Sequence, residues 1–234
     1  MSVLAIIPAA GTGVRMGGAT PKQFLSLEGV PIFVHTLRKF VAADAIDEII
    51  LALRPEDMER AQADVDREHF AKPVRLVCGG DTRQETVARA LAEAPPATEL
   101  VVVHDAVRPF IEGEMIQRVV EAARKDGAVI LGIPSVDTVK QVERYSILGT
   151  IPRERIVLAQ TPQAFRYSII QEAFARATED GFNGTDESSL VERLGTTVTV
   201  LMGSDRNIKI TKPSDLPLAR LYIAQEREQK KAEV

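Results

Sequence analysis

Apolar runs of strand length alternate with helix-like segments along nearly the whole chain. The strand candidates, in chain order, are residues 3–9 (VLAIIPA), 48–54 (EIILALR), 74–80 (VRLVCGG), 99–106 (ELVVVHDA), 128–134 (AVILGIP) and 197–203 (TVTVLMG). The helix candidates between them are residues 32–43, 55–65, 82–94 and 114–127. Strands that are apolar throughout and alternate with helices are typical of a parallel sheet covered on both faces. The pattern therefore predicts an α/β fold, with a mostly parallel twisted sheet and helices on both faces.

Two of the predicted helices carry boundary signals. Asp81 is a plausible N-cap for the helix over 82–94, and a Pro-Pro pair directly after this helix would end it. Gly127 is a natural C-cap for the helix over 114–127.

Residues 135–155 break the alternation. Within them DTVKQVE predicts a polar strand, SILG a turn and TIPRERIV a returning strand, which together form a projecting two-stranded arm. The faces of this arm show little of the alternation that burial requires, so we expect the arm to pair with a second subunit. The chain from 1 to 234 is interpreted as a single domain, with 135–155 as a projecting dimerisation arm.

Composition narrows the class of protein. The 234 residues are 45% hydrophobic and 26% charged, which is ordinary for a globular protein, and the longest apolar runs are too short to cross a bilayer. The start MSVLAII lacks the features of a signal peptide and predicts a strand. The single cysteine, Cys78, allows no internal disulfide and fits a reducing cytoplasm; we expect it to be a small buried residue. A net charge of −4 argues against nucleic-acid binding.

Glycines, carboxylates and cations follow the predicted strands. The segments in question are PAAGTG, CGGDTR, HDAVRP, PSVDTVK and GSDRNIK. Because ligands bind at the carboxyl ends of the strands in such sheets, these segments are the candidate binding loops.

The first of these loops, PAAGTGVRMGGATPKQF at 8–24, is typical of phosphate binding but matches neither common motif. A dinucleotide site requires G-x-G-x-x-G, and here the third glycine, Gly17, comes one residue late after Gly11 and Gly13. The Gly-Lys-Ser/Thr of a Walker loop occurs nowhere in the chain. A long glycine loop with Arg15 and Lys22 remains, which is able to wrap a triphosphate. Taken alone, either cation is more often simply solvated.

The signature PAAGTGVRM…PKQF resembles that of the nucleotidyltransferases that make sugar nucleotides. In particular, it is similar to the 2-C-methyl-D-erythritol 4-phosphate cytidylyltransferase family of the non-mevalonate isoprenoid pathway. The resemblance continues in the family's order through GGDTRQETV (79–87), HDAVRPF (104–110), DTVK (137–140), QTPQAF (160–165), TDESS (185–189) and NIKIT (207–211). These blocks cover essentially the full chain, and they imply a Rossmann-like nucleotidyltransferase fold.

The resemblance implies that CTP and methylerythritol 4-phosphate react to give the cytidine diphosphate ester and pyrophosphate. Arg15 and Lys22 would then be the catalytic cations, stabilising the pentacoordinate α-phosphate and the leaving pyrophosphate. Asp105 matches the carboxylate that binds Mg²⁺ or another divalent cation, with Asp205 as a candidate second ligand. Because an acceptor phosphate is already an anion near neutral pH, catalysis would consist of positioning and charge stabilisation.

The remaining site residues are carried over from the family's motifs. The acceptor-binding residues would be Arg153, Lys209, Thr138, Arg108 and Thr161. The nucleotide-binding residues would be Pro8, Ala9, Ala10, Gly11, Gly13, Gly80, Asp81, Thr86 and Ala106. Thr86 stands where serine is expected and keeps the hydroxyl. Arg153 lies in the arm, which in the family reaches across a homodimer into the neighbouring site. Without the matches DTVK and QTPQAF on either side, Arg153 and Arg155 would be interpreted as ordinary exposed arm charges.

Three alternatives remain at this point. A ribitol 5-phosphate cytidylyltransferase would share the CTP half of the site and differ near Thr138, Arg153 and Lys209. A dinucleotide-dependent oxidoreductase is disfavoured by the late third glycine. A non-catalytic nucleotide-binding domain is disfavoured because Asp105 and the two loop cations are all present. The three histidines show no metal-ligand spacing and are interpreted as structural or solvent-facing.

Overall fold

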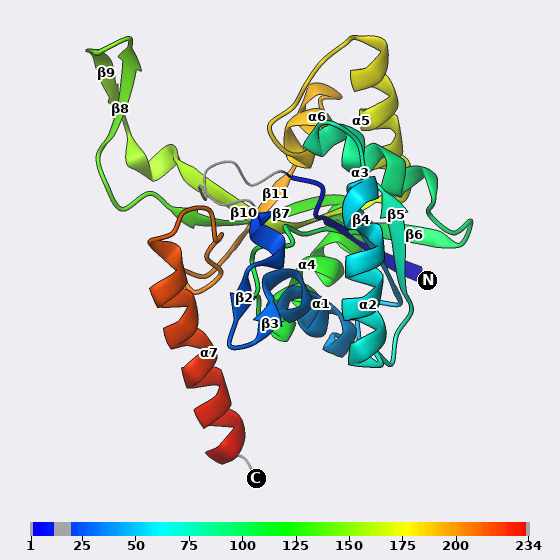
Figure 1. Ribbon diagram of the computed structural model, residues 1–234. Helices are drawn as coiled ribbons and strands as arrows, with labels where there is room; N and C mark the ends of the chain where they lie inside the picture. Colours follow the sequence, from blue (N-terminus) through cyan, green and yellow to red (C-terminus); the bar gives the residue numbers. More distant parts are fainter. Residues whose placement is uncertain (1, 12–19, 233–234) are drawn as a thin grey trace.

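The computed structural model describes residues 2–11 and 20–232, and within these the main sheet has seven strands in the order β11-β7-β10-β6-β1-β4-β5 (Figure 1). Its strands are β1 (Ser2–Pro8), β4 (Glu48–Leu53), β5 (Val74–Cys78), β6 (Thr98–Val103), β7 (Ala128–Pro134), β10 (Val157–Arg166) and β11 (Thr199–Met202). Only β10 runs antiparallel to its neighbours β6 and β7 among these strands, and the other pairs are parallel. The mostly parallel α/β sheet predicted from the sequence is confirmed.

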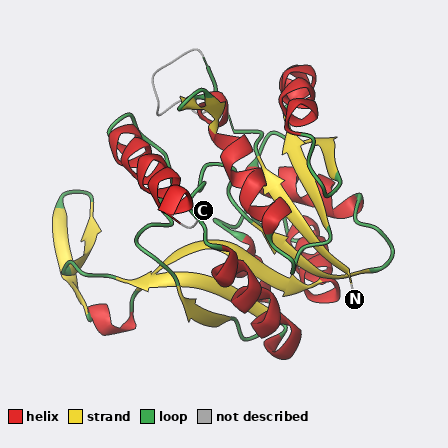
Figure 2. Ribbon diagram, turned by 90° about the horizontal axis from the view of Figure 1, so that it is seen from below, coloured by secondary structure: helices red, strands yellow, loops and turns green. Residues whose placement is uncertain are grey.

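Helices cover both faces of the sheet (Figure 2). They are α1 (Ile32–Ala42), α2 (Met58–Glu68), α3 (Arg83–Ala92), α4 (Gly113–Asp126), α5 (Tyr167–Glu179), α6 (Glu187–Arg193) and α7 (Asp215–Ala232). One core cluster joins α1, α2 and α4 to the sheet, through residues such as Phe33, Ala61 and Val119. A second joins α3, α5 and α6 to the opposite face, through Val87 and Phe174 among others. Burial on both faces explains why the parallel strands are apolar throughout.

Short elements complete the chain. They are η2 (Lys22–Phe24), β2 (Ser26–Leu27), β3 (Val30–Pro31), η3 (Pro55–Asp57), β8 (Val139–Glu143), β9 (Ser146–Ile151) and η4 (Arg153–Arg155). Helix α7 packs through Ala219 and Ile223 on a third cluster that includes Leu27 and Phe110. This contact places α7 beside the β2–β3 hairpin rather than on the sheet (Figure 1).

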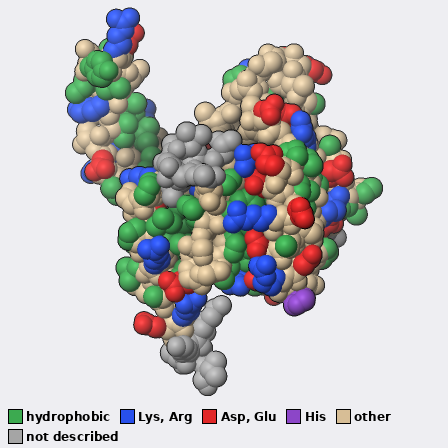
Figure 3. All heavy atoms as spheres, in the orientation of Figure 1, with side chains coloured by type: hydrophobic (Ala, Val, Ile, Leu, Met, Phe, Trp, Pro, Cys, Tyr) green, Lys and Arg blue, Asp and Glu red, His purple; other side chains and the backbone are tan. Residues whose placement is uncertain are grey.

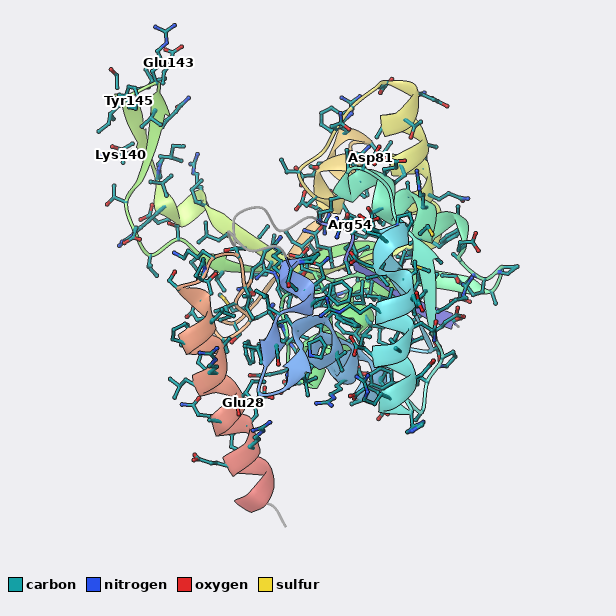
Figure 4. The ribbon with its side chains drawn as sticks, in the orientation of Figure 1. Glu28, Arg54, Asp81, Lys140, Glu143 and Tyr145 are labelled. Carbon is teal, nitrogen blue, oxygen red and sulfur yellow. The ribbon has the colours of Figure 1, made fainter. Side chains whose placement is uncertain are left out.

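Strands β8 and β9 pair with each other in a sheet of their own and project from the body of the molecule (Figure 1 and Figure 2). Figure 4 shows Lys140, Glu143 and Tyr145 on this arm, far from the main sheet. The turn lies at Arg144 and Tyr145, where Arg144 has a φ of 53°. The prediction that SILG forms the turn is wrong, because these residues lie within β9, where Ser146, Ile147 and Gly149 pair with β8.

Two further local predictions are wrong. The N-cap of α3 is Thr82 rather than Asp81, because the Thr82 hydroxyl accepts a hydrogen bond from the Glu85 amide at 3.0 Å. Cys78 is exposed rather than buried, because β5 is an edge strand.

The predicted C-cap at Gly127 is confirmed, since its φ of 89° suits glycine. None of the described helices is long and apolar enough to cross a membrane.

Candidate active site

A cavity of about 210 Å³ lies where the loops after β1, β5 and β6 meet. Its lining includes Pro8 to Gly11 from the first loop, Gly80 to Arg83 from the second and Asp105 to Val107 from the third. Lys22, Gln23, Thr86 and Lys209 complete the wall. The cavity therefore stands at the carboxyl ends of the strands, where ligands of open parallel sheets bind.

The start of the glycine loop is fixed by a buried glutamine. Gln23 Nε2 donates to the carbonyl oxygen of Ala9 at 2.6 Å and to that of Gly11 at 3.1 Å. The Ala9 amide donates to the carbonyl oxygen of Ala52 in β4. These bonds connect η2, which carries Lys22, to the end of β1, so both ends of the long loop are anchored beside the cavity.

The second loop approaches the first very closely. A Cβ atom on Gly79 would lie 2.8 Å from Ala10 Cβ and 2.9 Å from Thr86 Cγ2, so this position requires glycine. Thr86 is buried in the first turns of α3 and accepts a hydrogen bond from the Gly80 amide at 3.1 Å. The wall of the cavity at this point is therefore built largely from backbone.

Asp105 follows β6 and is surrounded by basic side chains of the described residues. Lys209 Nζ lies 2.9 Å from Asp105 Oδ2, Arg108 Nε lies 3.2 Å from the same oxygen, and Arg83 Nη2 lies 3.4 Å from Asp105 Oδ1. Burial alone raises the pKa of Asp105, but the positive charges of these neighbours outweigh it and hold the pKa well below its usual range. Asp105 is therefore a carboxylate at any physiological pH.

Behind Asp105, a buried histidine and threonine fix its backbone. His104 Nε2 lies 3.0 Å from the carbonyl oxygen of Arg108, which only accepts, so this nitrogen carries the proton. Thr161 then donates to His104 Nδ1 at 3.1 Å and accepts from the Asp105 amide at 3.0 Å. Burial lowers the pKa of His104 to about 4, which keeps the ring neutral as this arrangement requires.

Arg83 joins Asp105 to a second buried acid. Its Nη1 pairs with Glu187 Oε1, and the Glu187 side chain is 1% exposed. Burial raises the pKa of Glu187 and outweighs the lowering effect of Arg83. For Arg83, burial lowers the pKa, but the negative charges of Glu187 and Asp105 raise it by a larger amount. The guanidinium therefore stays charged. Sequence reasoning missed this pair, although both residues lie inside the quoted blocks 79–87 and 185–189.

Comparison with known proteins gives a consistent result. The sequence model described as 2-C-methyl-D-erythritol 4-phosphate cytidylyltransferase matches residues 3–225. The chain is 54% identical over 235 residues to the enzyme of that name from Acidobacterium capsulatum, covering 96% of this chain and 98% of that one. It is 51% identical over 237 residues to the one from Solibacter usitatus, covering 97% of each chain.

Solved structures with similar folds carry the same or an equivalent enzyme name. The structure of 4-diphosphocytidyl-2C-methyl-D-erythritol synthase from Anaerococcus prevotii has a TM-score of 0.85 and 33% identity, covering 95% of this chain and 96% of that one. The structure of 2-C-methyl-D-erythritol 4-phosphate cytidylyltransferase from Thermus thermophilus has a TM-score of 0.75 and 33% identity. This match covers 96% of this chain and 98% of that one. The chain belongs to the 2-C-methyl-D-erythritol 4-phosphate cytidylyltransferase family. The resemblance inferred from the sequence is confirmed, and the comparisons do not favour the ribitol 5-phosphate alternative.

The structure brings most of the predicted site residues of this cytidylyltransferase to one cavity. Those in its lining are Pro8, Ala9, Ala10, Gly11, Lys22, Gly80, Asp81, Thr86, Asp105, Ala106 and Lys209. Arg108 and Thr161 are buried directly behind Asp105 rather than in the cavity wall. Gly13 and Arg15 lie outside the described residues.

Three further predicted residues, besides Arg108 and Thr161, lie outside the lining. Arg153, on η4 at the base of the arm, is exposed and donates to the carbonyl oxygen of Val136 at 2.9 Å. Thr138 is exposed just before β8, and Asp205 is exposed in the loop after β11. The arm of the same chain therefore does not deliver Arg153 and Thr138 to this cavity wall.

Asp81 and Asp105 are the carboxylates of the cavity lining. Among the described residues, no group of three or more His, Cys, Asp or Glu side chains is arranged to hold a metal ion. Mg²⁺ is commonly held in proteins by one or two carboxylates, with water and substrate phosphates completing six oxygen ligands.

Proposed function

We propose that this chain transfers the cytidylyl group of CTP to 2-C-methyl-D-erythritol 4-phosphate and releases pyrophosphate. One observation carries the proposal: a buried carboxylate, Asp105, stands among basic side chains in a cavity whose wall includes the start of the glycine loop. The family membership over nearly the full chain supports the choice of substrates.

In this reaction a phosphate oxygen of the acceptor attacks the α-phosphorus of CTP. The new phosphorus–oxygen bond joins the acceptor phosphate to the α-phosphate of CTP. The bond from the α-phosphorus to the oxygen between the α- and β-phosphates breaks, and its electron pair leaves on pyrophosphate. The acceptor phosphate is already an anion near neutral pH, so no general base is required. The barrier is the repulsion between polyanions, which fixed positive charges reduce.

Lys22 and Arg15 are our candidates for the cations that stabilise the α-phosphate and the leaving group. The support for Lys22 is its place in the cavity wall, on the short helix that Gln23 anchors to the glycine loop. Arg15 rests on the sequence resemblance alone. The backbone amides of the glycine loop would bind the same phosphates.

Lys209 is our candidate for binding the acceptor phosphate, because it reaches the cavity beside Asp105. Arg108 and Thr161 contact Asp105 directly, so we propose that they hold this carboxylate in place while the acceptor lies in front of it. Asp105 would hold Mg²⁺ when the metal is bound, and Asp205, the candidate second ligand, rests on the sequence resemblance alone. The bound metal would neutralise charge on the triphosphate.

Backbone groups around Gly80, Asp81 and Thr86 are proposed to read the cytosine ring. A wall built from backbone and small side chains admits close contact to the polar edge of a base, and its limited width excludes a purine. Pro8, Ala9, Ala10, Gly11, Gly13 and Ala106 would complete the nucleotide site.

We further propose that the protein is a homodimer joined through the arm at 135–155. Hydrophobic side chains gather on this arm in Figure 3, and those of Val136, Tyr145 and Ile147 are 81%, 104% and 64% exposed. An arm with exposed apolar residues and few contacts of its own is suited to a second copy of the chain. In such a dimer Arg153 and Thr138 would enter the partner's cavity.

The reaction itself is proposed to take place in the cytoplasm, with small molecules as the only substrates. The acidic net charge of −4 disfavours nucleic acid, and the single cysteine suits a reducing compartment.

The direct test is pyrophosphate release from CTP with Mg²⁺, comparing methylerythritol 4-phosphate with ribitol 5-phosphate. We expect turnover with the first acceptor and little with the second. Turnover with ribitol 5-phosphate alone would keep the mechanism and overturn the acceptor, whereas no release with either acceptor would overturn the proposed function.

A further inference from the structure

Three consecutive residues in the loop after β5 each have a backbone group that is hydrogen-bonded by a side chain of α3. The hydrogen bonds run from Arg89 Nη1 to the Gly79 carbonyl oxygen (2.7 Å), from the Gly80 amide to Thr86 Oγ1 (3.1 Å) and from the Asp81 amide to Glu85 Oε2 (2.9 Å). Helix α3 therefore fixes the path of this loop from Gly79 to Asp81 with side chains of its first two turns.

Glu85 and Arg89 also bind each other, one helical turn apart. Arg89 Nη2 donates to Glu85 Oε1 at 2.5 Å, and the side chains of Arg89 and Glu85 are 50% and 40% exposed, respectively. The hydrogen bond from the Asp81 amide, with that from Arg89, lowers the pKa of Glu85 and keeps it charged. Neither residue lines the cavity, whereas Gly80 and Asp81 do. The pair therefore holds the cavity wall from its outer side.

The loop has little room to adjust without changing the cavity. Gly79 is packed between Ala10 of the glycine loop and Thr86, and its amide donates to the Leu53 carbonyl oxygen at 2.6 Å. An ion pair as exposed as Glu85–Arg89 contributes little to folding stability, because solvent screens its charges. Its larger effect is on geometry, because it sets the direction of the backbone groups at the wall.

We propose that Glu85 and Arg89 are positioning residues for recognition of the nucleotide base. They hold the backbone of residues 79–81 in the orientation that meets the edge of cytosine. The inference rests on the proposed function, in which this wall faces the base while the loop cations face the triphosphate. Loosening the pair then weakens contacts to the base and leaves contacts to the phosphates unchanged.

The test compares the binding of CTP with that of inorganic triphosphate, which has no base, by isothermal titration without acceptor. Arg89→Met removes the guanidinium and keeps the apolar stem, and Glu85→Ala removes the acceptor for the Asp81 amide. Each variant is expected to lower CTP affinity about three- to ten-fold, the effect of one or two lost hydrogen bonds. Triphosphate affinity stays at the wild-type value, and Arg89→Lys gives an intermediate loss for CTP.

The matched control is Arg176→Met on α5, which removes an arginine from an exposed pair with Glu179 on the surface. It leaves both affinities unchanged. In turnover, Arg89→Met raises the KM for CTP and leaves the KM for the acceptor at its wild-type value.

Unchanged CTP affinity in both Arg89→Met and Glu85→Ala overturns the proposal, as does an equal loss for CTP and triphosphate. If one of these variants does not fold, Arg89→Lys with the other decides the question. A wild-type protein that binds CTP but turns over no acceptor would contradict the proposed function, and the binding comparison would still test the role of the pair.

Discussion

At the scale of single residues, the charge balance around Asp105 governs the site. Lys209, Arg108 and Arg83 each contact its carboxylate, and all of them carry positive charge into a partly buried cavity. This excess of positive charge suits a site for two phosphorylated substrates, because it offsets their mutual repulsion. Asp105 compensates these cations, and in the proposed function it also offers oxygen to a divalent ion.

Replacing Asp105 by asparagine separates these roles. We expect kcat/KM to fall at least about 100-fold in Asp105→Asn, because the metal loses its protein carboxylate. The uncompensated cations cost about 3 kcal/mol of folding stability. Triphosphate without metal binds at least as tightly as to the wild type, since the cavity becomes more positive. Weaker triphosphate binding in a folded variant would contradict this assignment of charge.

His35 offers a second test at this scale, one that concerns folding. Burial lowers the pKa of His35, as do Arg38 and Arg227, while the hydrogen bond to the Leu27 carbonyl and Glu226 raise it. Because the unfolded chain takes up the proton first, near pH 6.5, stability is full above this pH and falls as the pH decreases below it.

The measurement is the thermal midpoint between pH 7 and pH 5. In His35→Gln the midpoint should fall less across this interval than in the wild type. Identical pH dependence in the wild type and His35→Gln would show that His35 is not protonated preferentially in the unfolded chain.

Some contacts between site residues could be predicted from the sequence, and others could not. Asp105 and Lys209 stand in motifs that follow strands, and strand ends converge at one edge, so their meeting was predictable. The pairing of Arg83 with Glu187 was not, because it depends on how α6 packs against α3. Arg83 looked like any other surface arginine in the sequence, and no local pattern indicates its buried partner.

At the scale of elements, the apolar strands and the polar arm strand β8 were predictable from the sequence, whereas the polar part of β10 was not. The parallel strands are buried on both faces and so appear as continuous apolar runs. Strand β10 contains the polar segment QTPQ, and its Gln160, Thr161 and Gln163 are buried. Their hydrogen bonds come from distant segments: Asn207 donates to Gln160, and Ser188 donates to Gln163. Such burial of polar groups depends on tertiary partners and leaves no periodic signal.

The short element η4 carries a prediction of its own. Arg153→Ala should raise the KM for the acceptor phosphate about ten-fold or more, the usual effect of losing a charged hydrogen bond, and leave CTP affinity unchanged. Arg155→Ala, two residues along the same element, is the matched control. Reduced CTP affinity in Arg153→Ala would mean that this part of the arm faces the nucleotide instead.

At the scale of the whole molecule, the cavity and the arm are separate in one chain. The cavity lining includes no arm residue, while the arm projects away from the sheet (Figure 1). If a partner's arm completes each site, activity requires two chains, and the two halves of a site can be supplied by different variants.

Mixing two defective variants tests this arrangement, with the acceptor kept well below the KM of Arg153→Ala so that this variant alone turns over little. Lys22→Ala damages the cavity of its own chain, and Arg153→Ala damages the arm. After subunit exchange, half of the dimers are mixed and each has one intact site, so activity should recover to about a quarter of the wild-type value. Two portions of Lys22→Ala treated in the same way are the control. Full exchange of subunits without any recovery would place both residues in the site of one chain.

The central claim is that the acceptor's phosphate attacks the α-phosphorus of CTP. Phosphorus NMR of a reaction with acceptor labelled with oxygen-18 in its phosphate tests it most directly. We expect a diphosphate ester in which the label occupies the bridge and the former acceptor phosphate, and pyrophosphate that carries none. Label in pyrophosphate, or cytidine monophosphate and unchanged acceptor as the only products, would contradict the account.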